Sequence, residues 1–335
     1  SKYLGGDRNT KWIKDLNYMQ KAIPKKHVNP FFKINQEKFN SELTSLKNSV
    51  YKLNDDQILS GIYKIIAGIG DTHTSLYKKT SIIYPIQFYY FKEGIYVVNT
   101  LPEYKQALYT KLVKINGVDI ETIQKNILPL IVNENSALIK KYIPKYLTNV
   151  EILHGLNITS SVKNALFTFE NSQGDNFNLN IDSLNNEDIH GKFIIKGTFD
   201  TSYPLYMQKS NLNYWYKYIA AEKTLYFKYN KCQEDNNSKT IEDFTTDMLK
   251  FMGSHIVDKF VIDIRDNSGG SDKYITPIIN WIKTKKINNK DHLFVIVGRT
   301  TFSSAILNAV TLRKETNATF IGEETSGKPN HYGSV

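Results

Sequence analysis

Short apolar runs separated by helix-type spacing characterise the last third of the chain. Residues 260–264 and 293–298 are mostly apolar, which is typical of strands buried on both faces of a parallel sheet. Between them, isoleucines recur at i, i+3, i+4 and i+7, which predicts a helix over 274–283 with one buried face. This alternation predicts an α/β fold with a crossover-connected parallel sheet. The other elements predicted here are strands over 224–229 and 318–322 and helices over 240–251 and 305–315.

The preceding residues change from helical to strand-like periodicity. Three helices come first, and the third opens on the acidic pair Asp55-Asp56. Strand-like runs then predominate, with turns at Asn116-Gly117 and Gly174-Asp175 that each join two apolar runs. The predicted helices cover 10–23, 39–53, 55–69 and 136–147. The predicted strands cover 82–90, 94–98, 165–169 and 177–181, together with two short apolar runs on either side of the Asn-Gly turn within 112–120.

These changes of pattern predict several domains. At 335 residues the chain is longer than one ordinary core requires. We expect a helical N-terminal region over 1–78, a β-rich module over 79–135, a linker and β-hairpin region over 136–215, and an α/β core over 216–335.

Composition narrows the function classes. A hydrophobic content of 41% with 23% charged residues indicates a globular protein. The net charge is +10, but the lysines are scattered and no nucleic-acid-binding motif accompanies them, so a solvated basic surface is expected and no nucleic-acid partner. The single cysteine excludes an internal disulfide, and the histidines lack metal-ligand spacing, so we expect no metal and no cofactor. No apolar run has membrane-spanning length.

Two polar loops at strand ends carry the candidate chemistry. Ser303 stands at a strand-to-helix turn, where its hydroxyl is exposed and the N–H of Ser304 has no helical partner. At the neighbouring strand end, Gly269 and Gly270 let backbone N–H groups approach a ligand, so these donors and Ser304 could hold an oxyanion. Open α/β sheets place their sites at this edge. The alternative is that Ser303 only caps its helix and the glycines only form a turn.

A nucleophilic serine needs a general base, and two residues are candidates. His73 lies in Gly-Asp-Thr-His-Thr over 70–74, and Lys328 ends Gly-Glu-Glu-Thr-Ser-Gly-Lys over 322–328. A lysine base needs a pKa lowered by burial so that a neutral amine exists at working pH. The residues themselves leave both candidates open.

Three motifs together resemble one serine peptidase family. Asp-Ile-Arg-Asp-Asn-Ser-Gly-Gly over 263–270, Thr-Phe-Ser-Ser-Ala over 301–305 and the 322–328 segment are similar to consecutive motifs of the C-terminal processing (tail-specific) peptidases and the tricorn protease core. The resemblance is strong over the last hundred residues or so. It implies peptide-bond hydrolysis with Ser303 as nucleophile, and it implies a PDZ-like fold for the module over 79–135.

The details of the motifs favour the histidine branch of this family. The Thr-Phe-Ser-Ser-Ala form and the placement of His73 match the tricorn-like members, and Ile306 replaces a glutamate found in many lysine-type members. In that branch an acidic third residue would be expected, and it would lie beyond Val335. The alternatives are a Ser303–Lys328 dyad and a non-catalytic ligand-binding or peptide-binding member of the fold.

The resemblance also implies partners and a location. A protein or peptide substrate is expected, and homo-oligomer formation stays open. Family members are often exported, so we expect an extracellular or cell-envelope protein whose signal segment is absent from this sequence. The carboxylate-binding loop of true PDZ domains is not visible in 79–135, so peptide capture by this module is an open question.

Overall fold

The computed structural model describes residues 6–72, 74–76, 78–196, 202–236 and 239–327. The chain divides into two compact units. The first is built mainly from Ser1–Glu134 and Ile139–Ile195, and the second from Asn135–Leu138 and Lys196–Asn330. The predicted four-part division of the chain stays a prediction.

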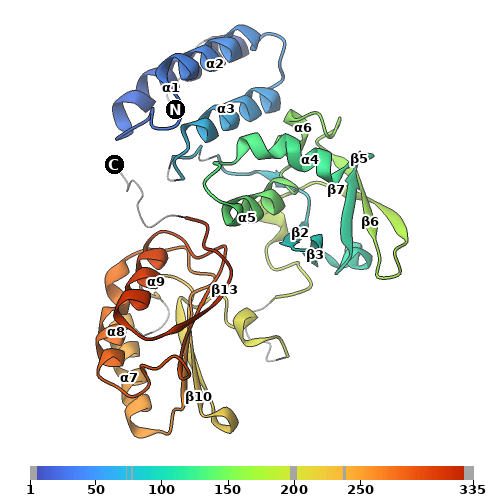
Figure 1. The fold of residues 1–335 in the computed structure, drawn as a ribbon. Coiled ribbons are helices and arrows are strands. Elements are labelled where there is room, and N and C mark those ends of the chain that lie inside the picture. Colours follow the sequence, from blue (N-terminus) through green and yellow to red (C-terminus); the bar gives the residue numbers. More distant parts are fainter. Residues whose placement is uncertain (1–5, 73, 77, 197–201, 237–238, 328–335) are drawn as a thin grey trace. The chain divides into compact units, whose positions relative to one another are not determined.

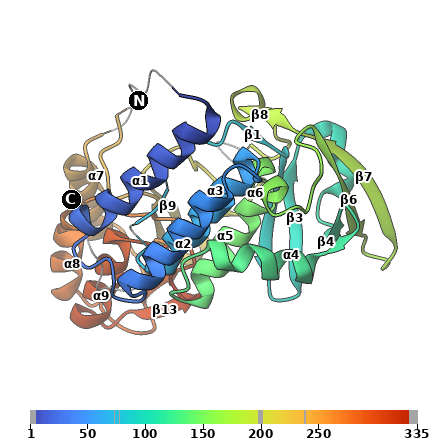
Figure 2. The same ribbon diagram turned by 90° about the horizontal axis from the view of Figure 1, so that it is seen from above.

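Three helices open the first unit and lie side by side (Figures 1 and 2). They are α1 (Arg8–Lys26), α2 (Gln36–Ser49) and α3 (Asp55–Ile69), close to the predicted ranges. An asparagine or aspartate side chain caps each N-terminus, and Asn54 forms a capping box with Gln57 at the start of α3. α3 ends at Gly70, whose φ of 78° is the left-handed conformation that glycine adopts without strain.

A sheet with the strand order β2-β3-β4-β6-β7 completes the first unit, and β5 pairs with β4. The Asn116-Gly117 turn between β4 and β5 has positive φ at both residues, as the sequence predicts. β6 and β7 form the predicted hairpin, and β6 pairs with β4, so this hairpin belongs to the same sheet as the strands before it. The strands are β1 (Ile82–Ile83), β2 (Ile86–Phe91), β3 (Gly94–Thr100), β4 (Lys111–Ile115), β5 (Val118–Asp119), β6 (Asn164–Glu170), β7 (Asn176–Asp182) and β8 (Leu184–Asn185), and the helices are α4 (Ile120–Ile127), α5 (Ser136–Tyr146) and α6 (Val150–Gly155).

Two expectations for this part of the chain need correction. The predicted strand over 82–90 is divided at Tyr84-Pro85, because β1 pairs with β8 whereas β2 pairs with β3. Proline lacks the N–H that a continuous ladder would need. The chain over 150–155 forms helix α6, which the sequence did not predict; Asn149 caps it.

The second unit contains a five-stranded sheet with the order β13-β12-β11-β10-β9. β10 to β13 are parallel, so their carboxyl ends lie along one edge. Leu225, Phe227 and Tyr229 point from β10 into the core formed with helices α7, α8 and α9. The elements are β9 (Tyr214–Ile219), β10 (Thr224–Tyr229), α7 (Ile241–Ser254), β11 (Lys259–Asp263), α8 (Thr276–Lys283), β12 (Leu293–Val297), α9 (Ser304–Glu315) and β13 (Thr319–Gly322).

Strand β9 is the main correction to the predicted core. No strand was predicted over these residues: Tyr214 and Trp215 were assigned to the linker and hairpin region and 216–219 to the α/β core. Nevertheless, β9 pairs antiparallel with β10 along its whole length. Its aromatic residues pack on both faces: Tyr216 contacts the core of the unit, and Trp215 packs against Tyr226 on the opposite face, with the two rings tilted by 54°. The sheet is therefore mixed, with one antiparallel strand at its edge.

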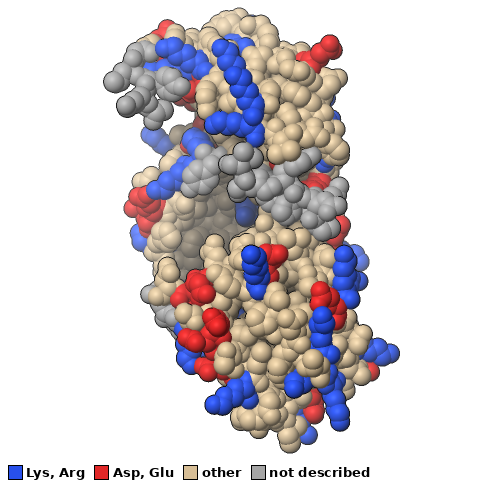
Figure 3. Space-filling model, turned by 90° about the vertical axis from the view of Figure 1, so that its left-hand side faces the viewer, with Lys and Arg blue, Asp and Glu red and all other residues tan. Residues whose placement is uncertain are grey.

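Charged side chains of both signs are scattered over the surface, as the sequence indicates. On the face shown in Figure 3, the described lysines and arginines are interspersed with aspartates and glutamates. Among the helices described, none is both long and apolar enough to cross a membrane.

Candidate functional site at the strand ends of the second unit

Ser303 lies between β12 and α9 in a backbone conformation that is rare for a residue with a side chain. Its φ of 54° and ψ of −129° fall outside the allowed regions for most residues. A serine held in a sharp strand-to-helix turn of this kind presents its hydroxyl away from the helix. Ser303 occupies the N-cap position of α9, but its side chain makes no capping hydrogen bond. The alternative expectation, a serine that only caps its helix, is therefore wrong.

The diglycine turn packs directly against this serine. A Cβ on Gly269 would lie 2.8 Å from the Cβ of Ser303 and 3.1 Å from the backbone N of Ser304. Gly269 has a φ of 110° and Gly270 a φ of 136°, which both require glycine. The Oγ of Ser304 donates to the Gly270 carbonyl at 2.5 Å. The structure thus brings together four of the predicted site residues: Ser303, Ser304, Gly269 and Gly270.

The hydrogen bonds distinguish between the three expected oxyanion donors. The N–H of Gly269 already donates to Asn267 Oδ1 at 2.9 Å, which corrects the expectation that this group is available. The N–H of Ser304, at the first position of α9, has no acceptor among the residues described, and neither has that of Gly270. Gly270 and Ser304 are thus the two candidate donors that remain.

Thr301 joins the two loops that carry these groups. Its side chain is fully buried, and its Oγ1 donates to the Ile264 carbonyl at 2.9 Å while it accepts from Gly298 N at 3.0 Å. One hydroxyl therefore ties the end of β11 to the turn after β12. The sequence analysis missed this role, because nothing in the local pattern distinguishes Thr301 from its neighbour Thr300.

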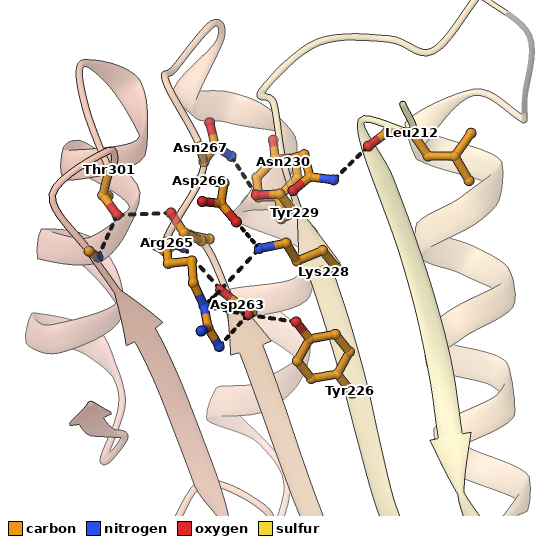
Figure 4. A network of polar contacts seen from close by, with 12 residues as sticks. Leu212, Tyr226, Lys228, Tyr229, Asn230, Asp263, Arg265, Asp266, Asn267 and Thr301 are labelled. Carbon is orange, nitrogen blue, oxygen red and sulfur yellow. Dashed lines mark hydrogen bonds and ion pairs between the residues drawn. The ribbon is translucent and has the colours of Figure 1, made fainter. Parts of the chain in front are cut away.

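A buried ionic network lies under the first loop, on the sheet face opposite the helices (Figure 4). Asp263 is fully buried and accepts hydrogen bonds from Arg265 Nε at 2.9 Å and Tyr226 OH at 2.6 Å. Lys228, with 1% of its side chain exposed, lies 3.4 Å from Asp263 and 2.5 Å from Asp266. The network explains the Asp-Ile-Arg-Asp part of the first motif, since each charged residue of that part anchors the loop.

Charge and burial oppose each other at Asp263. Burial acts to raise the pKa of this carboxyl, but Lys228, Arg265 and Tyr226 outweigh it and hold the pKa below its usual range. For Tyr226, burial and the neighbouring Asp263 raise the pKa of the phenol. Asp263 is thus a carboxylate and Tyr226 a neutral hydrogen-bond donor at neutral pH.

Both candidate bases, His73 and Lys328, lie outside the described residues, so their roles stay predictions. Asp71, in the same motif as His73, accepts a hydrogen bond from Thr74 Oγ1 at 2.6 Å, and its Oδ2 lies 3.0 Å from His27 Nε2. In the part of the chain that the structure covers, no three histidine, cysteine, aspartate or glutamate residues are grouped so as to hold a metal ion.

Comparison with known proteins finds structural relatives only. No protein-family profile matches the chain, and no curated protein matches it in sequence. A serine-to-alanine mutant of CPAF superposes with a TM-score of 0.65 at 10% identity, over 95% of this chain and 84% of that one. Mature CPAF gives 0.62 at 11% identity, over 95% and 84%, and its complex with lactacystin gives 0.58 at 10% identity, over 95% and 85%.

Sequence identities this low show that the chain shares a fold with these structures, and they do not show that it shares their function. The multi-domain α/β architecture expected from the pattern of the chain is the architecture found. The resemblance to the family of the C-terminal processing peptidases and the tricorn core, drawn from three motifs, is thus confirmed at the level of the fold, which this chain shares with CPAF.

Proposed function

We propose that this chain is a serine endopeptidase that hydrolyses peptide bonds of protein or peptide substrates through an acyl-enzyme on Ser303. The observation that carries the proposal is the backbone of Ser303, whose φ of 54° holds an uncapped hydroxyl at a strand-to-helix turn. Strain of this kind costs about 1–3 kcal/mol and persists where the surrounding structure requires it. The fold shared with CPAF supports the same conclusion.

The proposed reaction combines Ser303 and its two candidate oxyanion donors with a general base. His73 takes the hydroxyl proton as Ser303 Oγ attacks the carbonyl carbon of the substrate. The N–H groups of Gly270 and Ser304 then stabilise the negative charge that develops on the carbonyl oxygen. His73 gives its proton to the departing amine, and a water molecule hydrolyses the ester by the same steps. Lys328 is the alternative base.

Covalent labelling tests the nucleophile. A fluorophosphonate probe should label the wild-type chain once and leave Ser303→Ala unlabelled, because only an activated serine reacts with it. Ser254→Ala is a matched control in the same unit, since the Ser254 hydroxyl bonds only to carbonyls and a ring nitrogen of its own helix end. A wild-type chain that takes no label would instead indicate the non-catalytic, ligand-binding alternative.

The same assay identifies the base. We expect His73→Ala to slow labelling by about a hundredfold or more and Lys328→Ala to leave it nearly unchanged, since a positioned base contributes about 10²–10⁴ to the rate. The reverse result would assign the base to Lys328. Export of the chain and the PDZ-like fold of residues 79–135 stay predictions, and homo-oligomer formation and peptide capture stay open questions.

A further inference from the structure

The side chain of Asn267 connects the loops that surround Ser303. It is fully buried, and its Nδ2 donates to the Tyr229 carbonyl at the end of β10 at 3.0 Å (Figure 4). Its Oδ1 accepts the Gly269 N–H at 2.9 Å. Its backbone carbonyl accepts the N–H of Phe302, the residue before Ser303, at 3.0 Å. One residue thus bonds to β10, to the diglycine turn and to the nucleophile loop.

The direction of the Gly270 N–H follows from the bonds beside it. The N–H of Cys232 donates to the Gly269 carbonyl at 3.0 Å, and the Cys232 carbonyl accepts from Ser271 at 2.8 Å. This parallel bridge uses the peptide groups on either side of Gly270. In such a bridge the N–H and C=O of the central residue, here Gly270, point away from the bridged partner. The Gly270 carbonyl accepts from Ser304 Oγ, so its N–H also faces the Ser304 side.

We propose that Asn267 is a positioning residue for the reaction at Ser303: by holding the Gly269 N–H and the Tyr229 carbonyl, it fixes the turn so that the Gly270 N–H points at the substrate oxygen. The inference rests on the proposed function and deepens it. An oxyanion donor acts only when its direction is set in advance, because reorganisation during the reaction costs part of the stabilisation. The hydrogen bonds of Asn267 described above go to Tyr229, Gly269 and Phe302 and not to the Ser303 side chain.

The substitution Asn267→Ala should lower kcat by about a hundredfold, close to the effect of losing one oxyanion donor. KM should change little, since the donor acts on charge that exists only in the transition state. Affinity for a peptide aldehyde, whose adduct with the serine carries the same oxyanion, should fall in parallel with kcat.

Asn308→Ala is the matched control. Asn308 is also a buried asparagine in this unit. It donates to the Asp272 carbonyl at 2.9 Å and accepts from Cys232 Sγ at 3.4 Å, and among the described residues it makes no hydrogen bond to the diglycine turn. We expect a similar fall in thermal stability with kcat nearly unchanged. Equal losses of kcat in the two variants, or full activity in a folded Asn267→Ala protein, would overturn the inference.

Asn267→Asp gives a second test that does not depend on a truncated side chain. A protonated aspartic acid matches asparagine, since its O–H can donate to the Tyr229 carbonyl while its C=O accepts the Gly269 N–H. The ionised form cannot donate and places a charge in a buried position, so burial favours the acid form. The ratio of kcat in this variant to kcat in the wild type should therefore rise severalfold as pH falls from about 8 to about 5.

The groups around this position do not produce such a rise by themselves. The titratable neighbours are Cys232 and Tyr229, whose pKa values are both raised mainly by burial, and Asp272 beyond Cys232. The variant and the wild type have the same catalytic base. Dividing kcat of the variant by kcat of the wild type at each pH therefore removes the effect of the titration of that base. A ratio that is constant with pH would contradict the positioning role. If the proposed function itself is wrong, the result is different: the wild type takes no label and has no activity, so no ratio of kcat values can be measured.

Discussion

At the scale of single residues, Ser303 combines reactivity with strain. A positive φ is tolerated by glycine and disfavoured for serine, because the Cβ crowds the backbone. Gly269 is required for a related reason: the closest atom to a Cβ at that position is the Cβ of Ser303 itself. The two residues are therefore coupled, since one can occupy its position only because the other has no side chain.

Relief of this strain gives a prediction about stability. Ser303→Gly should be more stable than Ser303→Ala by about 1–2 kcal/mol, because glycine adopts this backbone conformation without the steric cost. Both variants should be inactive, since neither has a nucleophile. Urea unfolding followed by tryptophan fluorescence measures the difference, and Trp215 and Trp281 both lie in the unit concerned. Equal stability of the two variants would show that the turn is not strained in solution.

At the scale of elements, the ends of β10, β11 and β12 are joined by polar side chains where the apolar core ends. Asn267 and Thr301 are buried between these strand ends, and Lys228, Asp263 and Arg265 form the ionic network on the opposite face. Arg265 also stacks on the ring of Tyr206 at 4.6 Å. Buried polar groups of this kind stabilise a structure only when all are satisfied, so the loss of one partner should be costly.

Removal of one cation from this network should destabilise the second unit strongly. We expect Lys228→Met to cost about 3 kcal/mol at neutral pH, because Asp263 and Asp266 lose a buried partner. Lys239→Met, which breaks the exposed pair with Asp247, should cost below about 1 kcal/mol. Urea unfolding of both variants beside the wild type makes the comparison.

The same ionic network predicts how the stability of the protein changes at acid pH. The pKa of Asp263 is lowered in the folded protein, so its contribution to stability is present above the unfolded pKa near 3.8 and is lost as pH falls through the lower folded value. The difference between wild type and Lys228→Met should therefore shrink as pH falls below about 4. A difference that stays constant down to acid pH would exclude a charge interaction as its cause.

At the scale of the whole molecule, the proposed reaction needs residues from sequence ranges that belong to different units. Ser303 and its oxyanion donors belong to the second unit, whereas position 73 falls in the sequence range of the first. The local pattern over 70–74 makes His73 a candidate base, but no pattern along the chain shows which of His73 and Lys328 serves Ser303. The identity of the base is therefore best settled by its titration.

The pH dependence of kcat/KM distinguishes the two candidate bases. With His73 as base, activity should fall as pH drops below about 6.5, because the imidazole must be neutral to accept a proton. With Lys328 as base, activity should continue to rise well above neutral pH unless burial lowers the pKa of the amine. Steady-state hydrolysis of a fluorogenic peptide over the pH range gives the profile. A profile that is flat across pH 5 to 9 would fit neither base and would contradict the mechanism.

Local pattern was enough to predict most helices and the parallel part of the core sheet. Helix α3 is found over its predicted range, and β10 to β13 follow the predicted apolar runs. The failures share a cause: β9 and α6 have six residues each, and so short an apolar run does not distinguish a strand from a helix. Pairing with β10 determines the strand, and packing against α3 accompanies the helix. Of the candidate site, the motifs predicted Ser303 and the diglycine turn but not Asn267, Thr301 or Lys228.

The sequence by itself determined the order of the elements, because burial of an apolar face depends on spacing along the chain. It also determined which loops carry the serine and the glycines. Only the tertiary structure decided that Gly269 uses its N–H within the turn, while the N–H groups of Gly270 and Ser304 have no acceptor in the described part of the chain. The physical reason is that a hydrogen bond depends on direction and distance between groups, and those are set by how neighbouring strands align rather than by the residues next to each group.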